Sequence, residues 1–457
     1  MLRRNGHFKL DDKRILVLGT TGIDKRKALH NISNWYQDDP PWEPAINFEK
    51  DYLFNPAKKG LRRNTFLDAS LETQFNTWAN AWDVFAKEKK LTKKGNRGTR
   101  GMLLSMHGVY LRGHYGTRSV LLPTLIAKQF KPDIIITLIA DAYNSWWTTE
   151  AFAEGDALLG RPTLEDLVIG RRQEILVGDL IALACRPDPV RNVMLSASHP
   201  VECVAHCIDN PDPRVVYLSF PISEPRRMRY TKEPKSDSGM SEVSDFVRAA
   251  FAHQHKHPDL VVECPLMIDE LPLRELIMTE GERVFDDGYY SRYKTMKKLA
   301  SDDTEEVPHV FFPRDVYRWP LGDMCDLRDC IVPPTDKEQL AFPVAQIVNA
   351  AGNIYTDVTL RDYRYVDQAE CLAVYNPVFN SDREGISGSV QQEIDHAIKS
   401  DRRVFVYQDP ARDKTNAVGK QFGQPNATMR ADPGKTRKFR AASPEQLLEA
   451  ISSYKRD

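Results

Sequence analysis

The sequence has no run of about 18 apolar residues among its 457 positions, so it predicts no transmembrane helix. Its basic start, residues 1–7, leads into no apolar segment, so we expect no signal peptide. An excess of charge of one sign is also lacking, because 63 Lys and Arg residues balance 64 Asp and Glu residues to a net charge of −1. This balance argues against a membrane partner and against a general nucleic-acid partner, although local basic patches remain compatible with it.

Cysteine is scarce. The seven cysteines are scattered along the chain and odd in number, which suits a reducing cytosol better than a disulfide framework. We therefore expect a cytoplasmic protein.

One group of closely spaced residues, His199, Cys203, His206 and Cys207, could supply metal ligands. On a helix, positions 199, 203 and 206 or 207 share a face. We interpret these residues as core residues of a helix near a domain junction, and we expect no metal site.

The length predicts two domains, because single cores rarely grow beyond about 250–300 residues. The first half contains short apolar runs typical of buried strands, separated by helical periodicity. These runs are 14–18, 102–109, 133–140 and 193–197. Strands that alternate with helices predict a parallel sheet covered on both faces. The Pro-containing stretch 210–213 then indicates a boundary, so we expect domains at 1–210 and 211–457.

A second strand–helix series begins directly after the boundary. Its expected strands are 215–220, 260–264, 371–375 and 403–407. Residues 275–345 are charged and contain prolines, and we interpret them as a helical insertion that could act as a lid. The expected fold class is therefore α/β, with two doubly wound parallel-sheet domains and an insertion in the second.

A glycine turn follows the first expected strand. Gly19, Gly22 and Lys25 lie between that strand and a helix, which is the setting of a phosphate-binding P-loop with the pattern G-x-x-x-x-G-K-[S/T]. Asp24 stands where the second glycine belongs and would put an anion where phosphate oxygens approach. Arg26 replaces the hydroxyl residue that usually binds Mg²⁺. The turn predicts weak binding of ATP or another nucleotide, with little dependence on Mg²⁺.

The surroundings of this turn resemble the nucleoside monophosphate kinase group of P-loop proteins over residues 13–205. The resemblance rests on the turn, on a strand that runs into Asp141, and on Arg161, Arg171 and Arg172 near a long helix. It implies a nucleotide-binding domain, and the two departures in the turn favour a degenerate sensor or an oligomerisation scaffold over a working kinase. The alternative is that the glycines only form a tight turn and that the arginines are solvated.

The segment 387–397 is the most informative part of the second half. Ser387, Ser389, Glu393 and Ala397 have spacings that resemble the S-x-G-x-x-x-E-x-x-x-A signature of the nucleoside 2-deoxyribosyltransferase and deoxynucleoside monophosphate N-glycosidase family. Ser389 stands where the family usually has glycine. The alternative is a surface glutamate after a serine at a helix start.

The resemblance implies that Glu393 is a nucleophile. Cleavage of a nucleoside bond develops oxocarbenium charge at C1′, and a carboxylate below the sugar can stabilise that charge or attack it. We expect Glu393 in the first turn of a helix, held ionised by the helix N-terminus. We expect Ser387 and Ser389 to bind the phosphate or the sugar.

Further features follow in the family's order, and the resemblance covers residues 214–408. Tyr217, in the first strand of this half, would line the pocket. Asp362 matches the carboxylate that orients the base or protonates its leaving nitrogen. Glu370 stands where Asp is usual, next to the strand 371–375, and is expected to bind substrate.

Arg226, Arg227 and Arg229 follow the first strand of this half, where the resemblance implies a phosphate-binding loop. Guanidinium groups suit a phosphate better than a neutral nucleoside. These residues therefore favour a nucleoside monophosphate as the substrate, and the alternative is a solvated charge cluster.

The expected function is that of an N-glycosidase or glycosyltransferase that cleaves a nucleotide, with a deoxynucleoside monophosphate preferred and NAD as another candidate. The glycosidase site would require no cofactor, and the resemblance implies a homo-oligomer. A second hypothesis is a nucleotide-sensing regulatory or defence protein, in which the first domain controls the assembly or activity of the second.

Overall fold

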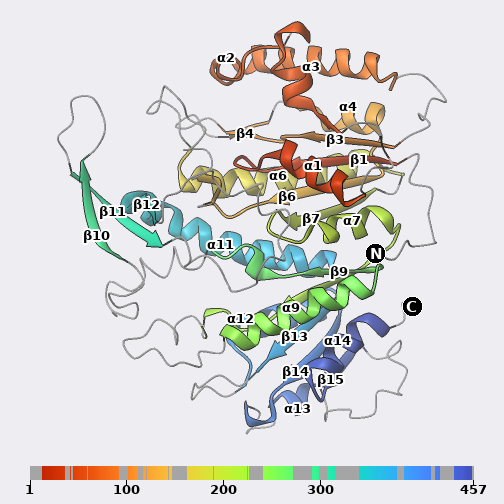
Figure 1. Cartoon of the computed structure of the whole chain (residues 1–457), viewed down its shortest axis with the longest axis vertical. Coiled ribbons are helices and arrows are strands. Elements are labelled where there is room, and N and C mark those ends of the chain that lie inside the picture. The colour runs from red at the N-terminus through yellow and green to blue at the C-terminus, as the bar shows by residue number, and fades with distance from the viewer. Residues whose placement is uncertain are drawn as a thin grey trace. The chain divides into compact units, whose positions relative to one another are not determined.

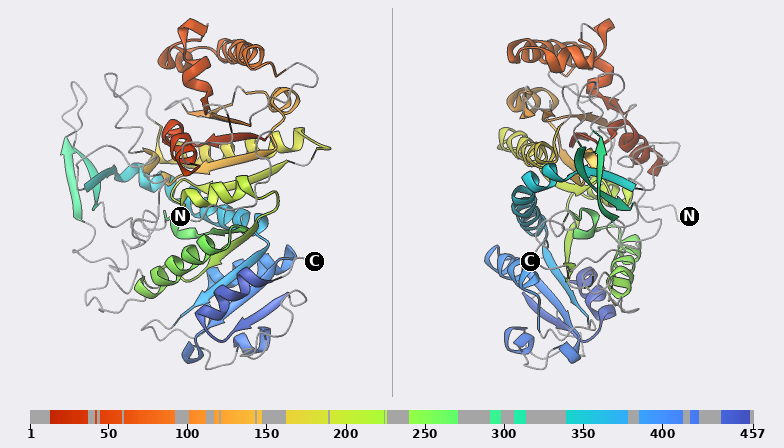
Figure 2. Two further views of the ribbon diagram at one scale, coloured as in Figure 1. Left: turned by 45° about the vertical axis from the view of Figure 1, so that its right-hand side comes forward. Right: turned by 90° about the vertical axis from the view of Figure 1, so that its left-hand side faces the viewer.

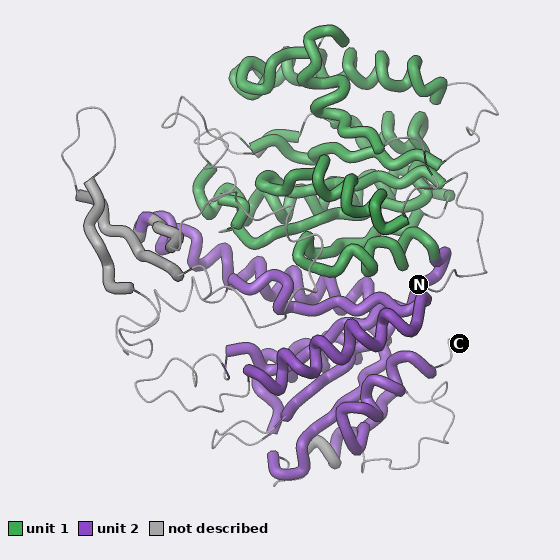
Figure 3. Tube along the Cα trace, viewed as in Figure 1, with its two compact units in different colours: residues 1–209, 325–335 green, residues 210–324, 336–457 purple. Residues whose placement is uncertain are grey.

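The computed structural model of the chain divides into two compact units, and the division falls between Asp209 and Asn210 (Figures 1 and 3). The residues that the structure describes are 13–36, 42, 45–58, 60–91, 101–111, 117–119, 121–142, 144–146, 162–188, 190–223, 225, 240–270, 291–297, 306–313, 339–377, 385–412, 417–422 and 437–454.

The N-terminal unit is built on a five-stranded sheet whose strands are all parallel. Their order is β2 (Ile46–Asn47), β3 (Met102–Met106), β1 (Arg14–Gly19), β6 (Ile134–Ile139) and β7 (Arg191–Ser196). Five of the six residues of β1 and all six of β6 are buried, as expected for central strands covered on both faces. The chain leaves β1 toward β2 and leaves β6 toward β7, so the connections diverge at the carboxyl ends of β1 and β6, which is where open α/β sheets bind ligands.

Helices cover this sheet. They are α1 (Lys25–Trp35), α2 (Arg63–Asp68), α3 (Leu71–Glu88), α4 (Pro123–Leu125), α6 (Leu164–Ala184) and α7 (Val201–Asp209), with short helical turns at Glu49–Leu53, Pro56–Lys58 and Ile126–Phe130. Leu16 and Leu18 of β1 pack in one core with Trp78 and Trp82 of α3 and with Ile181 of α6, so α3 and α6 share a face of the sheet. A two-stranded ribbon, β4 (Tyr110–Leu111) with β5 (Thr117–Arg118), adjoins α6.

The C-terminal unit also has five parallel strands. Their order is β15 (Lys438–Ala441), β14 (Arg403–Gln408), β13 (Cys371–Asn376), β8 (Arg214–Ser219) and β9 (Leu260–Glu263). Numbered along the chain this order is 2-1-3-4-5, a doubly wound arrangement whose switch point lies between the first and third strands, here β8 and β13.

Two pairs of helices cover the second sheet (Figure 2). The helix α11 (Val344–Gln368) packs against α12 (Gly388–Lys399), and α9 (Met240–Lys256) packs against α14 (Pro444–Ser453). Short helices lie at Pro265–Met267, Pro410–Arg412 and α13 (Ala417–Phe422). Ser443 caps α14 by accepting a hydrogen bond from the Gln446 backbone N–H, and Pro444 occupies the first helical position, where its missing N–H costs nothing.

The prediction of a helical insertion is wrong for the part of residues 275–345 that the structure describes. Instead, β10 (Ser291–Lys297), β11 (Glu306–Pro313) and β12 (Gln339–Pro343) form an antiparallel sheet, and β12 leads directly into α11. Charge and proline content suggested a helical region, but strand formation depends on pairing with neighbouring strands, which local composition does not reveal. Two parallel edge strands, β2 and β15, were not expected because they are very short.

Among the described residues, no helix combines the length and the apolar character needed to cross a membrane.

Candidate functional site

The most promising site lies in the C-terminal unit at the carboxyl ends of β8 and β13. These strands are hydrogen-bonded neighbours, with Ser219 of β8 paired to Val374 of β13. Tyr217 and Ser219 are two residues apart on β8 and therefore point to the same face, the face that α11 and α12 cover. This is the switch point of the sheet, where doubly wound proteins bind their ligands.

Glu393 of α12 reaches both hydroxyl groups of that strand. The Tyr217 hydroxyl donates to Glu393 Oε1 at 3.3 Å, and the Ser219 hydroxyl donates to Glu393 Oε2. Both β8 residues are fully buried. The helix α12 begins at Gly388, so Glu393 lies in its second turn rather than in the expected first turn.

The expectation that the helix N-terminus holds Glu393 ionised is also not supported. Burial among protein atoms raises the pKa of Glu393, and the nearby charge of Asp362 raises it further, to about 8. The hydrogen bonds from Ser219 and Tyr217 and the charge of Arg361 oppose this rise without cancelling it. The desolvation of a buried carboxylate therefore exceeds the stabilisation available from a helix terminus one turn away.

Asp362 comes to the site from α11. Asp362 lies inside this 25-residue helix, and its side chain is 13 % exposed. The Arg361 guanidinium donates to Asp362 Oδ1 through Nε at 3.0 Å and through Nη2 at 2.9 Å. The charge of Asp362 raises the pKa of both Tyr217 and Glu393, so the structure brings all three expected residues into one electrostatic cluster.

A neighbouring aromatic ring holds Tyr217 in place. Its ring stacks on the ring of Tyr365 of α11, with centroids 5.8 Å apart and an interplanar angle of 11°. Burial, and then the charges of Asp362 and Glu393, raise the pKa of Tyr217 well above its ordinary value. The phenol therefore stays protonated at all physiological pH values and remains a hydrogen-bond donor to Glu393.

Ser387 and Ser389 lie at the start of α12. Ser387 is the residue before the first helical position, its side chain makes no capping hydrogen bond, and its Oγ lies 3.4 Å from the Ser389 Oγ. Ser389 is exposed. The two hydroxyls are thus on the helix that carries Glu393, at the end where backbone N–H groups lack helical acceptors.

Three polar residues at the same edge were not found by sequence analysis. Asn376 ends β13 and donates to Gly385 O at 3.1 Å and to Gln408, which ends β14. Arg412 donates to Asn376 Oδ1 at 3.2 Å and to Pro377 O at 3.0 Å. All three are buried. Asn376 and Gln408 could have been identified as polar residues at the ends of apolar strands. The hydrogen bonds of the three residues hold the loops beside the switch point.

Glu370 is not part of the cluster. It directly precedes β13, at the amino end of the sheet, and accepts a hydrogen bond of 2.8 Å from the hydroxyl of Tyr454, the residue after α14. The carboxyl-end site lies at the opposite end of the same strand. Arg226, Arg227 and Arg229 lie outside the described residues.

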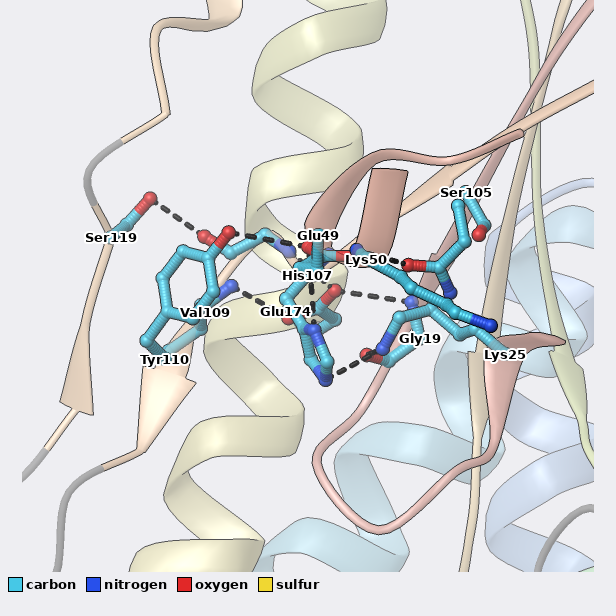
Figure 4. A network of polar contacts seen from close by, with 12 residues as sticks. Gly19, Lys25, Glu49, Lys50, Ser105, His107, Val109, Tyr110, Ser119 and Glu174 are labelled. Carbon is cyan, nitrogen blue, oxygen red and sulfur yellow. Dashed lines mark hydrogen bonds and ion pairs between the residues drawn. The ribbon is translucent and has the colours of Figure 1, made fainter. Parts of the chain in front are cut away.

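The second cluster of interest lies in the N-terminal unit (Figure 4). The turn from Gly19 to Lys25 joins β1 to α1, as the pattern predicts, but the Lys25 side chain is only 3 % exposed. Lys25 Nζ lies 2.6 Å from His107 Nε2 and 3.4 Å from Gly19 O. Burial lowers the pKa of Lys25 to about 8, opposed by the carboxylates of Glu49 and Glu174. Lys25 is thus directed into a buried polar network.

Other residues of the kinase resemblance also have internal partners. The Asp24 side chain accepts a hydrogen bond of 3.1 Å from the Lys27 backbone N–H and caps α1. The Arg171 guanidinium is buried and donates to Ala140 O at 2.9 Å, so it is not solvated. Arg161 lies outside the described residues.

Gly22 is required by the geometry of its turn. Its φ is +96°, and a Cβ there would lie 2.6 Å from Ser145 Cα and 2.9 Å from Ser145 O. We expect Gly22→Ala to destabilise the N-terminal unit by about 2–5 kcal/mol, from the left-handed backbone and the backbone clash together. Thermal unfolding measures this loss.

Gly352→Ala provides a matched control. Gly352 lies inside α11 and a Cβ there would meet nothing within 4 Å, so alanine should leave stability unchanged or raise it by up to about 1 kcal/mol. Equal melting temperatures for Gly22→Ala and the parent protein would contradict the turn geometry.

Within the described part of the chain, no group of three or more His, Cys, Asp or Glu side chains is arranged to hold a metal ion. His199, Cys203, His206 and Cys207 are all buried in or beside α7, and His206 Nε2 lies 3.4 Å from Glu202 Oε1.

No protein-family model matches the chain, and the comparison with curated proteins gives no significant match.

Proposed function

We propose that the C-terminal unit cleaves the N-glycosidic bond of a nucleotide, with Glu393 as the nucleophile. The observation that supports this most strongly is the position of the Glu393 carboxylate, which two buried hydroxyls of β8 hold at the switch point, with the second carboxylate of Asp362 nearby. Most enzymes that cleave glycosidic bonds use a pair of carboxyl groups, and here the pair lies at the ligand-binding edge of the sheet. The resemblance and the arginines at 226 and 227 favour a deoxynucleoside monophosphate, and NAD is the alternative substrate.

In the proposed reaction, a Glu393 carboxylate oxygen attacks C1′ of the sugar. A C–O bond forms, the C–N bond breaks, and its electron pair goes to the leaving base nitrogen, which takes a proton from solvent or from the protonated form of Asp362. Water or a second base then attacks C1′ and releases Glu393. Tyr217 and Ser219 fix the orientation of the carboxylate and limit its rotation. The nucleophile is therefore ordered before substrate binds, and the attack loses less conformational entropy.

The test is incubation of the purified protein with a panel of nucleosides, nucleoside monophosphates and NAD, followed by chromatography for released bases. Release of a base by the parent protein and none by Glu393→Gln would support the proposal. A panel that yields no base under any condition would contradict it.

The pH dependence of the reaction separates two roles for Glu393. As a nucleophile it acts only when ionised, and its raised pKa of about 8 means that most molecules are protonated at neutral pH. We expect kcat/KM to rise roughly tenfold per pH unit below about pH 8 and then to level off. A free 2′-deoxynucleoside is the suitable substrate, because its phosphate-free sugar does not titrate in this range. A rate that falls across the same range would make Glu393 the acid and contradict its role as nucleophile.

The second candidate is a nucleotide-sensing role for the N-terminal unit. The observation that favours it is Lys25 at the carboxyl end of β1, beside the point where the connections of that sheet diverge. ATP or another nucleotide would be the ligand. A biological effect that survives Glu393→Gln but is lost in Lys25→Ala would favour sensing over catalysis.

A further inference from the structure

Glu174 of α6 accepts three backbone hydrogen bonds in the interior of the N-terminal unit (Figure 4). The Gly19 N–H donates to Oε1 at 3.2 Å, the Gly108 N–H donates to Oε1 at 2.7 Å, and the Val109 N–H donates to Oε2 at 2.8 Å. Gly19 ends β1, and the other two residues follow β3. The side chain is 1 % exposed. A carboxylate thus occupies a niche of converging N–H groups at the carboxyl edge of the sheet.

The niche depends on close approach of the backbone. A Cβ on Gly108 would lie 2.8 Å from Val177 Cγ1 and 3.3 Å from Glu174 Cδ, so only glycine lets this N–H come so near to α6. A Cβ on Gly19 would lie 3.2 Å from two carbons of the Lys25 side chain. Three converging N–H groups of this kind are what proteins use to bind phosphate oxygens.

Cationic and hydroxyl groups surround the same niche. The positive charge of Lys25 acts on both Glu174 and Glu49, as its effect on their titration shows. Thr20, the residue after Gly19, has a buried hydroxyl that makes no hydrogen bond to any described residue. Asp24 already fills the start of α1 with a second internal carboxylate. The carboxyl edge of β1 therefore has the donors of an anion site, and carboxyl groups of the protein itself occupy these donors.

We propose that Glu174 is a built-in occupant of an oxyanion site formed by the N–H groups of Gly19, Gly108 and Val109, and that it competes with the phosphate group of a nucleotide. The contact is autoinhibitory: while the carboxyl group is in place, its oxygens occupy the N–H donors that a phosphate would use. The N-terminal unit consequently binds nucleotides weakly, and removal of the carboxylate exposes the donors and Lys25 to an external oxyanion. This inference does not depend on the chemistry of the C-terminal unit.

The test is isothermal titration calorimetry of the full-length protein with inorganic phosphate and with ADP. Glu174→Ala should bind both probes at least about tenfold more tightly than the parent protein, because charge-assisted contacts replace the internal ones. Adding Lys25→Met to Glu174→Ala should remove most of this gain. Glu72→Ala, which removes an exposed carboxylate from α3, should bind like the parent protein and controls for net charge.

Glu174→Gln decides the question if the alanine variant does not fold. Its amide oxygen can still accept from Gly19 and Gly108, whereas its NH₂ group faces the Val109 N–H, so the fold is retained and one donor is released. Circular dichroism confirms folding for each variant. Any ADP binding by the C-terminal unit is common to all variants and cancels in the comparison. Unchanged affinity in a folded Glu174→Ala or Glu174→Gln variant, or an equal gain in Glu72→Ala, would overturn the proposal.

Discussion

Glu393→Gln should reduce base release by about 10³-fold or more while leaving the fold intact, because the amide cannot form the glycosyl-enzyme bond. The amide keeps the size of the carboxyl group, its one oxygen can still accept from Tyr217 or Ser219, and its NH₂ group can donate to the oxygen of the other hydroxyl. The measurement is single-turnover release of base from the best substrate of the panel. Asp395→Asn is the matched control, because this exposed carboxylate lies on the same helix and contacts only Gln391 among the described side chains.

Stability against pH provides an independent check on the same variant. The folded-state pKa of Glu393 is raised above its ordinary value, so its contribution to stability is fully present below about pH 4.5 and is lost as pH rises toward about 8. Glu393→Gln has no such titration. The variant should therefore match or exceed the parent protein in melting temperature above about pH 8.

Base release that persists at more than a few per cent in a folded variant would remove Glu393 as the nucleophile.

The fold was largely predictable from the sequence because its central strands are continuous apolar runs. Strands β1, β6, β8 and β13 lie within one or two residues of their expected positions, since a strand buried on both faces must be apolar throughout. The antiparallel strands of the insertion lack this signature. Their existence depends on pairing partners, and no local pattern identifies those partners.

The site was predictable in part. Tyr217 and Glu393 are 176 residues apart, and they meet because β8 and β13 are adjacent, which composition cannot show. Ser219 could have been found from the two-residue period of a strand, which puts it on the face of Tyr217. Glu370 could have been excluded, because a residue that precedes a parallel strand lies at the amino end of the sheet, away from the ligand edge.

The position of Asp362 required the structure. The helix α11 runs on to Gln368, and Asp362 lies six residues before that end. At 1.5 Å per residue, these six residues carry it about 9 Å toward the carboxyl edge. Only the length of the helix, set by its packing on the sheet, brings this carboxylate to Glu393.

Asp362→Asn should lower turnover by about 10²-fold on a substrate whose base leaves only when protonated, as expected for loss of a positioned acid or orienting group. The charge of Asp362 raises the pKa of Glu393, so the substitution should also lower that pKa and move the rising limb of the pH profile to lower pH. The measurement is kcat/KM against pH for the parent protein and for the variant. Asp367→Asn is the control, because Asp367 is exposed on the same helix and contacts His396 and Ser400.

Asp362→Asn removes the group that assists the leaving base and also lowers the pKa of Glu393. These two effects change the rate in opposite directions. A lower pKa ionises more Glu393 at neutral pH and by itself would accelerate attack on C1′. A net loss of turnover therefore measures what Asp362 gives to the leaving base. With a base that leaves without protonation, the loss should disappear if Asp362 is the proton donor and persist if Asp362 orients the base. An unchanged rate together with an unchanged pH profile would mean that Asp362 acts on neither the substrate nor Glu393.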